Sequence, residues 1–354
     1  MTPLAREIAA RIAGAGPMPI DEYMRLCLSH PEHGYYRSRP AVGAAGDFIT
    51  APEISQVFGE LIGLWAAEVW AGMGRPSALH LVELGPGRGT LMADALRAVS
   101  KVAPAFRAAL YVHLVEINAA LRQQQDNALR NAAPQWHDDL TSLPDGPLII
   151  VANEYFDALP VRQKVRAPDG WHERVVTVDG AELRFDVGAA TEHAHDAPVG
   201  SIVETAPERE AEIRSLARRL VEHRGAALIV DYGPLVSDIG DTLQAVRNHK
   251  KVDPLAEPGL ADLTSHVDFA ALAKTAQDAG AATYGPIPQG IFLQRLGVMA
   301  RAATLVKKAT PQQASAIGRA IGRLIEPDQM GTLFKALVFA DRSQPLPPGF
   351  DPSS

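Results

Sequence analysis

The 354-residue chain predicts an α/β fold around a mostly parallel sheet. Three observations lead to this prediction. From residue 79 onwards, apolar runs of strand length alternate with helical patterns. The runs at 147–152 and 226–231 are almost entirely apolar, as strands covered by helices on both faces require. The strand at 79–84 leads directly into a glycine-rich turn and a helix start.

The chain before this core is predicted to be helical. Helices are expected over residues 3–14 and 20–30, and a stretch rich in Pro, Gly and Ala separates them from a third helix. That helix is expected to begin at Pro52, because proline favours the first helical turn, and to end at Gly72 or Gly74. Residues 1–60 are therefore expected to form an N-terminal helical and lid region.

The core is predicted to occupy residues 61–159 and 204–340. Its strands are read from short apolar runs and lie at 79–84, 110–116, 147–152, 226–232, 291–296 and 334–340. Between the two halves, residues 160–203 break the alternation of strands and helices. Short strand patterns joined by Pro-Asp-Gly and Asp-Gly turns predict a small antiparallel β insertion there. Residues 341–354 are expected to be a tail.

Composition argues against several classes of protein. The formal net charge of −7 disfavours general nucleic-acid binding, which needs a basic surface. No apolar run reaches the ~20 residues of a membrane span and the N-terminus has no signal-peptide core, so we expect a cytoplasmic protein. The single cysteine, Cys27, excludes an intramolecular disulfide. No metal is expected, since His193 and His195 have no third ligand nearby.

The glycine-rich turn is the most informative part of the sequence. Gly85, Gly87 and Gly89 let a ligand approach the backbone and the N-terminus of the next helix. Their spacing is G-x-G-x-G, whereas dinucleotide-binding proteins have G-x-G-x-x-G. Glu83 before the turn would repel a pyrophosphate but attract the cationic amino-acid end of S-adenosylmethionine (SAM). We therefore expect SAM as the cofactor; the alternatives are a nicotinamide or flavin, or a turn that serves only chain geometry.

Other candidate ligand-binding residues follow the predicted strands, at the edge where open α/β sheets bind ligands. Glu116 is placed to accept hydrogen bonds from both ribose hydroxyls of a nucleoside. Asp138 or Asp139 would take the adenine amino group, with Leu140 against the ring; a solvated surface turn is the alternative. Gly46-Asp47-Phe48 resembles the edge of a lid over the site.

The segment NEYFDALP, at 153–160, is the best candidate for the reacting face. Asn153 ends a strand, and Glu154 is the first choice for a carboxylate that holds a substrate guanidinium, whose pKa is above ~12. Asp157 is the second choice and has a helix cap as its alternative role. Glu53 would supply a further carboxylate, or would only favour a helix N-terminus.

Five blocks, in order, resemble the MidA-type family of SAM-dependent methyltransferases. They are GDFITAPEISQVFGELIG, VELGPGRGTL, ANEYFDALPVRQ, AVRNHKKVDPLAEPGLADLTSHVDF and QGIFLQRLG, and the resemblance covers nearly the whole chain. It implies a class I methyltransferase fold with a seven-stranded sheet. It also implies methylation of a protein arginine, which in the mitochondrial relatives lies on the 49 kDa subunit of NADH:ubiquinone oxidoreductase (complex I).

The resemblance also assigns residues to roles. The family's SAM motif falls on Glu83, Gly85, Gly87 and Gly89, and its GDF and NE-FDALP blocks fall on 46–48 and 153–160, with Tyr155 where many relatives have Phe. Two other functions stay open: an assembly chaperone that uses SAM structurally, and a small-molecule methyltransferase. A homodimer is compatible with all of these functions.

Overall fold

The computed structural model describes residues 1–38, 49–192 and 196–351. Its contacts divide the chain into two compact units, each made from three stretches of sequence. The first unit contains Met1–Phe48, Asp157–Ala211 and Ser237–His266, and the second contains Ile49–Phe156, Glu212–Val236 and Val267–Ser354. The division predicted from the sequence, with segments ending at residues 60, 159, 203 and 340, follows chain order and stays a prediction.

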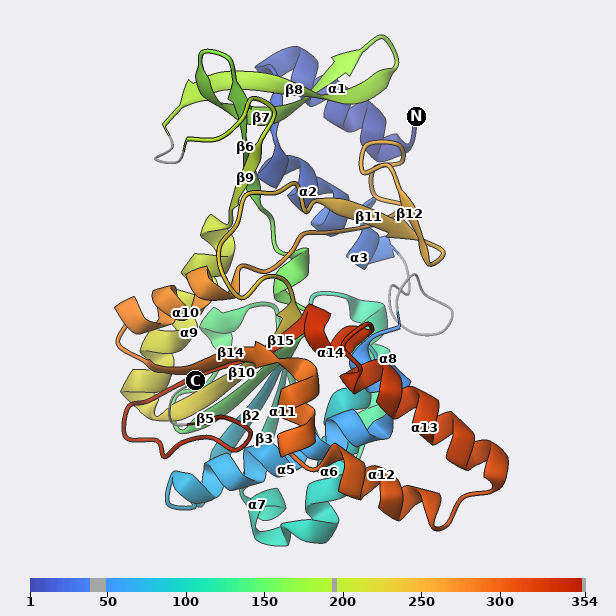
Figure 1. The fold of residues 1–354 in the computed structure, drawn as a ribbon, viewed down its shortest axis with the longest axis vertical. Coiled ribbons are helices and arrows are strands. Elements are labelled where there is room, and N and C mark those ends of the chain that lie inside the picture. The colour runs from blue at the N-terminus through green and yellow to red at the C-terminus, as the bar shows by residue number, and fades with distance from the viewer. Residues whose placement is uncertain (39–48, 193–195, 352–354) are drawn as a thin grey trace. The chain divides into compact units, whose positions relative to one another are not determined.

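The second unit is built on a seven-stranded sheet with the strand order β14-β15-β10-β5-β2-β3-β4 (Figure 1). The neighbouring pairs from β10 to β4 are parallel, and β15 runs antiparallel to both of its neighbours. The predicted α/β fold with a mostly parallel, seven-stranded sheet is confirmed. The strands are β2 (Leu79–Leu84), β3 (Leu110–Val115), β4 (Gln135–His137), β5 (Leu148–Asn153), β10 (Gly225–Tyr232), β14 (Ala282–Pro288) and β15 (Phe334–Ala340).

Helices cover this sheet because its strands are apolar on both faces. Helices α5 (Gln56–Gly72) and α6 (Thr90–Val102) share one buried core with Leu81, Leu114 and Ile149 of the sheet. The other helical elements are α4 (Ala51–Ile54), α7 (Pro104–Ala109), α8 (Ala119–Leu129), η1 (Leu140–Ser142), η2 (Phe156–Ala158), α9 (Pro207–His223), α10 (Phe269–Asp278), α11 (Gln289–Arg295), α12 (Val298–Val306), α13 (Pro311–Ile325) and α14 (Met330–Leu333).

The strand predicted at 291–296 is wrong, because residues 291–295 lie in α11 and Leu296 is the C-cap of that helix. A short apolar run such as IFL fits a buried helix as well as a strand. The missing strand is β14, whose sequence ATYGPIP contains Gly285 and Pro286 and therefore looks like a turn. The helix predicted from Pro52 is also interrupted, at Ser55, where the backbone is extended and the hydroxyl accepts a hydrogen bond from Val57 N to start α5.

The first unit holds the predicted N-terminal helices and β insertion, and both are confirmed. Its elements are α1 (Pro3–Ala15), α2 (Ile20–Ser29), α3 (Tyr35–Ser38), β1 (Met18–Pro19), β6 (Arg162–Ala167), β7 (Gly170–Asp179), β8 (Glu182–Thr191), β9 (Ile202–Thr205), β11 (Gln244–Arg247), β12 (Lys250–Val252) and β13 (Asp262–Thr264). The sheet of β11, β12 and β13 was not predicted. Across the described ranges, no helix has both the length and the apolar character needed to cross a bilayer.

Three histidines form a hydrogen-bonded row across β2, β3 and β4. His80 Nδ1 lies 2.9 Å from His113 Nε2, and His113 Nδ1 lies 3.0 Å from His137 Nε2. The row ends at the Ser142 hydroxyl, 2.9 Å from His137 Nδ1. Burial, together with the two neighbouring rings, lowers the pKa of His113 to about 4. The sequence did not predict this row, because its members are far apart in the chain.

Candidate active site

The candidate site lies where the strand order of the seven-stranded sheet reverses, beside β2 and β5. These two parallel strands are neighbours, and Leu84 at the end of β2 pairs with Ala152 near the end of β5. In open α/β sheets, the crevice outside such strand ends binds the ligand. The sheet therefore brings the glycine turn after β2 next to the segment that begins at Asn153.

The glycine turn has the backbone geometry that its sequence predicted. The φ angles of Gly85, Gly87 and Gly89 are +59°, +52° and +80°, in the left-handed region that favours glycine. A Cβ atom on Gly85 would lie 2.9 Å from Cδ2 of Tyr155, so the aromatic ring packs directly on the turn. Gly89 is the N-cap of α6, and it has no side chain to cap the helix. The N-terminus of α6 thus faces the turn with its own N–H groups.

Glu83 is buried at the end of β2, and only 3% of its surface is exposed. Its Oε2 has no hydrogen-bond partner among the described residues. Burial raises the pKa of the Glu83 carboxyl to about 8, although a backbone hydrogen bond from Met92 opposes the shift. A buried carboxyl oxygen without a partner fits a cationic ligand group, which would provide the missing charge and hydrogen bond.

Glu116 follows β3 and is linked to the glycine turn by a residue that the sequence analysis missed. Its Oε1 accepts a hydrogen bond from Asn118 N at 2.7 Å. Gln125 Nε2 donates both to Glu116 Oε2, at 3.3 Å, and to the carbonyl of Gly87, at 2.7 Å. Burial raises the pKa of Glu116, and these hydrogen bonds oppose the rise. A glutamine between an acid and a glycine turn is a signal that only the folded chain reveals.

The acids predicted to bind adenine have local partners. Asp138 forms an ion pair with Arg122, and 82% of its side chain is exposed. Asp139 caps η1 by accepting a hydrogen bond from Thr141 N at 2.8 Å. Leu140 is the first residue of η1 and is half-buried. These contacts hold the turn in a fixed conformation and leave the adenine role of all three residues a proposal.

Glu154 directly follows β5 in an unusual backbone conformation. Its φ is +51°, a left-handed value that is rare for a residue other than glycine. Its Oε1 accepts hydrogen bonds from Ala51 N, at 3.0 Å, and from Asn153 Nδ2, at 3.1 Å. Oδ1 of Asn153 is buried and has no partner within the described chain. Strained residues of this kind concentrate at functional sites.

Glu53 lies in α4 and contacts the glycine turn. Its Oε1 accepts a hydrogen bond from the Thr90 hydroxyl, and its Oε2 lies 3.5 Å from a guanidinium nitrogen of Arg88. Because both oxygens have partners on the turn, these contacts favour a role in holding the turn over a direct grip on a substrate. The sequence pointed to Glu53 but not to Thr90 or Arg88.

Other predicted residues are not brought to these strand ends by contacts within the second unit. Asp157 belongs to the first unit, where its carbonyl accepts hydrogen bonds from Ser265 N and Arg209 Nη2. Gly46, Asp47 and Phe48 lie outside the described residues, and so do His193 and His195.

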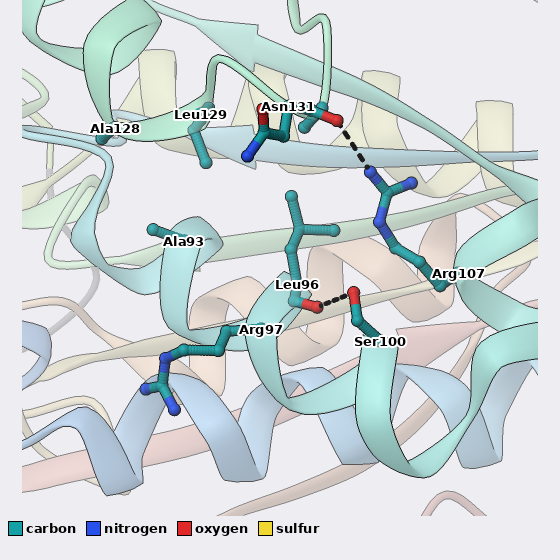
Figure 2. Close-up of a pocket in the computed structure, with 9 residues that line it drawn as sticks. Ala93, Leu96, Arg97, Ser100, Arg107, Ala128, Leu129 and Asn131 are labelled. Carbon is teal, nitrogen blue, oxygen red and sulfur yellow. Dashed lines mark hydrogen bonds between the residues drawn. The ribbon is translucent and has the colours of Figure 1, made fainter.

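A shallow hollow of about 210 Å³ lies elsewhere in the second unit, along α6, α7 and α8 (Figure 2). Its apolar part is formed by residues that include Leu96 and Leu129. At one edge, Arg107 reaches the carbonyl of Asn131 at 3.4 Å (Figure 2). This hollow shares no residue with the predicted site.

Comparison with known proteins agrees with the geometry. The model of a family of S-adenosyl-L-methionine-dependent methyltransferases matches residues 61–287. The chain is 38% identical to protein arginine methyltransferase NDUFAF7 homolog, mitochondrial, from Drosophila melanogaster, over 95% of this chain and 84% of that one. It is 36% identical to protein arginine methyltransferase NDUFAF7, mitochondrial, from Homo sapiens, over 94% of this chain and 82% of that one.

A solved structure is similar over almost the whole chain. It is a Burkholderia thailandensis protein bound to S-adenosyl-homocysteine, with a TM-score of 0.84 and 28% identity over 98% of this chain and 93% of that one. The comparisons also correct one expectation. The predicted cytoplasmic location is contradicted, because the curated relatives are mitochondrial proteins.

The donor set fits the cofactor that these comparisons indicate. The glycine turn leaves room for a ligand at the backbone, and Glu83 offers a buried oxygen without a partner in the described structure. S-adenosylmethionine is therefore the cofactor of this enzyme, as its sequence predicted. The chain belongs to the MidA-type family of S-adenosylmethionine-dependent methyltransferases.

Proposed function

We propose that this enzyme methylates a protein arginine, and that its substrate is the 49 kDa subunit of NADH:ubiquinone oxidoreductase during assembly of that complex. The names of the relatives support the first part, since they are protein arginine methyltransferases at 35–38% identity over nearly the whole chain. The choice of subunit rests on the family resemblance of the sequence blocks.

The proposal depends mainly on the position of the Glu154 carboxylate at the end of β5. A guanidinium has a pKa above ~12 and is cationic at neutral pH, which makes its nitrogens poor nucleophiles. A carboxylate that binds two of its N–H groups draws the charge toward those nitrogens and fixes the third in position. Glu154 follows β5, beside the glycine turn, and its conformation is held by hydrogen bonds to Ala51 and Asn153.

The other residues bind and orient. S-adenosylmethionine, when bound, supplies an electrophilic methyl group on a sulfonium sulfur. Glu83 would bind the cationic amino-acid end, and Glu116 would bind the ribose hydroxyls through its carboxylate. The glycines of the turn would admit the cofactor to the α6 N-terminus. Most of the rate enhancement would come from this positioning of the nucleophile against the methyl group.

The remaining assignments complete the proposal. Asp138, Asp139 and Leu140 would border the adenine, and Asn153 would contact the cofactor from the end of β5. Glu53 would hold the glycine turn through Thr90 and Arg88. The roles of Gly46, Asp47 and Asp157 stay predictions from the sequence, because the first two lie outside the described residues and Asp157 belongs to the first unit.

The test compares the arginine masses of the 49 kDa subunit in three strains: wild type, a deletion strain, and the deletion strain carrying Glu154→Gln. We expect the methylated arginine only in the wild type, while purified Glu154→Gln protein binds S-adenosyl-homocysteine with normal affinity. Glu68→Gln is the control for the loss of one charge, since Glu68 is exposed on α5.

Each part of the proposal has its own contradicting result. Unchanged arginine masses in the deletion strain would exclude this subunit as the substrate. Normal methylation by Glu154→Gln would exclude Glu154 from the reaction. If Glu154→Gln supports complex assembly fully without methylation, the essential function is binding, as in an assembly chaperone.

A further inference from the structure

Asp231 is a buried carboxylate that is not among the predicted site residues. It is the seventh residue of β10, at the carboxyl end of the strand, and its exposed fraction is 0%. β10 is the parallel neighbour of β5, and Val230 pairs with Asn153. Asp231 is thus one strand away from the segment that carries Glu154.

The carboxylate of Asp231 binds the backbone that follows Glu154. Its Oδ2 accepts hydrogen bonds from two consecutive amides, Tyr155 N at 3.2 Å and Phe156 N at 3.0 Å. Its Oδ1 accepts a hydrogen bond from Tyr232 N at 2.9 Å. Hydrogen bonds to an ionised acceptor are stronger than those between neutral groups, and two of them converge on one oxygen here.

These bonds hold Glu154 on its C-terminal side, and a further bond holds it on its N-terminal side. Glu154 N donates to the carbonyl of Val230 at 2.9 Å. Between these two attachments to β10, Glu154 has the left-handed φ of +51°. A non-glycine residue keeps such a conformation only when its surroundings enforce it. Return to an ordinary φ would turn the side chain away and break the hydrogen bonds on one side.

We infer that Asp231 is the positioning residue that sets the direction of the Glu154 carboxylate, an inference that rests on the proposed function of Glu154 in gripping the arginine. An ionised carboxylate suits this task, because both of its oxygens accept hydrogen bonds and three amides donate to them. An asparagine at this position would present an NH₂ group to at least one of the three amides, and a donor facing a donor cannot form a hydrogen bond. With the NH₂ group toward Tyr155 N and Phe156 N, the turn would lose both contacts; in the opposite orientation it would keep them, but without the negative charge that strengthens them.

The test uses Asp231→Asn, Glu154→Gln and the double variant, each purified as the full chain. For Asp231→Asn we expect an affinity for S-adenosyl-homocysteine within about twofold of wild type, and a kcat on the 49 kDa subunit about 100-fold lower, the scale of a small misplacement of a catalytic group. The KM for SAM should stay unchanged. The double variant should be no slower than Glu154→Gln, because both changes remove the same function.

Lys335→Met is the matched control. Lys335 lies opposite Asp231 in the neighbouring strand and is also buried, and its Nζ donates to the carbonyls of Gly233, Thr332 and Leu333. Its loss should lower the stability of the strand ends and leave kcat intact. If Asp231→Asn does not fold, Asp231→Glu takes its place, since it keeps the charge but moves both oxygens; kcat should fall while cofactor affinity is kept.

A crystal structure of Asp231→Asn with S-adenosyl-homocysteine completes the test, and it does not depend on the substrate. A negative φ at Glu154, or an altered path of the Tyr155–Phe156 backbone, supports the inference. An unchanged φ and side-chain direction overturns it, as do a wild-type kcat or an additive loss in the double variant. If wild-type enzyme fails to methylate the subunit, the proposed substrate is wrong, and the crystal structure alone decides the role of Asp231.

Discussion

Substitution of Glu83 by Gln should remove a loss of stability that the wild-type enzyme undergoes between about pH 4.5 and 8. Burial raises the pKa of the Glu83 carboxyl from 4.5 to about 8. Below pH 4.5 the group is protonated in the folded and in the unfolded chain, so its contribution to stability is fully present. As the pH rises further, the unfolded chain releases the proton while the folded chain keeps it, and the free energy of unfolding falls until the folded group ionises near pH 8.

The size of the effect follows from the same pKa values. Each pH unit between 4.5 and 8 lowers the free energy of unfolding by about 1.4 kcal/mol, or roughly 5 kcal/mol over the whole interval. Glutamine resembles the protonated acid in shape and does not titrate. The free energy of unfolding of Glu83→Gln, minus that of wild type, should therefore grow by about 1.4 kcal/mol per pH unit from pH 5 to 8 and then level off.

Urea unfolding followed by tryptophan fluorescence measures this difference, since Trp65 and Trp70 are buried in the same unit as Glu83. Glu68→Gln serves again as the control. Its free energy of unfolding, plotted against pH, should be displaced from the wild-type values by a constant amount and have the same slope. A difference between Glu83→Gln and wild type that stays constant from pH 5 to 8 would refute the reasoning, because it would mean that Glu83 ionises normally in the folded protein.

Two further substitutions test how the cofactor is held. Gly87→Val should abolish binding of S-adenosyl-homocysteine in calorimetry, because a branched side chain at φ +52° distorts the turn and fills the ligand's space. Gly180→Val is the control: this glycine has a φ of +60° on an open surface turn, and its substitution should leave binding unchanged. Gln125→Leu should weaken binding of S-adenosyl-homocysteine about tenfold, because Glu116 and Gly87 lose the side chain that donates a hydrogen bond to both. A tenfold loss corresponds to ~1.4 kcal/mol, about the net contribution of one hydrogen bond. Wild-type affinity in Gln125→Leu would contradict this role.

The central strands and the cofactor turn could be predicted from sequence because their signals are local. The runs at 147–152 and 226–230 are apolar, and the positive φ values of Gly85, Gly87 and Gly89 match what their spacing required. β14 could not be predicted in this way, because the Gly285 and Pro286 within it indicate a turn.

The support around the candidate site could not be predicted, because it depends on which strands become neighbours. Asp231 and Tyr155 are 76 positions apart, and their hydrogen bond exists only because β5 and β10 pair. The contact between Glu53 and Thr90 likewise joins two segments that the sequence keeps separate. The sequence thus identified residues that carry charge, whereas the folded chain identifies the residues that orient them.

The histidine row in the sheet restricts which ring nitrogens can carry a hydrogen at the same time. A backbone acceptor lies beyond each end of the row: one belongs to Asp145, beside His80, and the other is the carbonyl of Asp139, 3.3 Å from the Ser142 hydroxyl. Three neutral imidazoles and one hydroxyl contribute four hydrogens, while the chain from one end to the other has five contacts to fill. One of the five contacts therefore always lacks a hydrogen. If the contact without a hydrogen changes from one end of the chain to the other, each of the three imidazoles changes to its other tautomer.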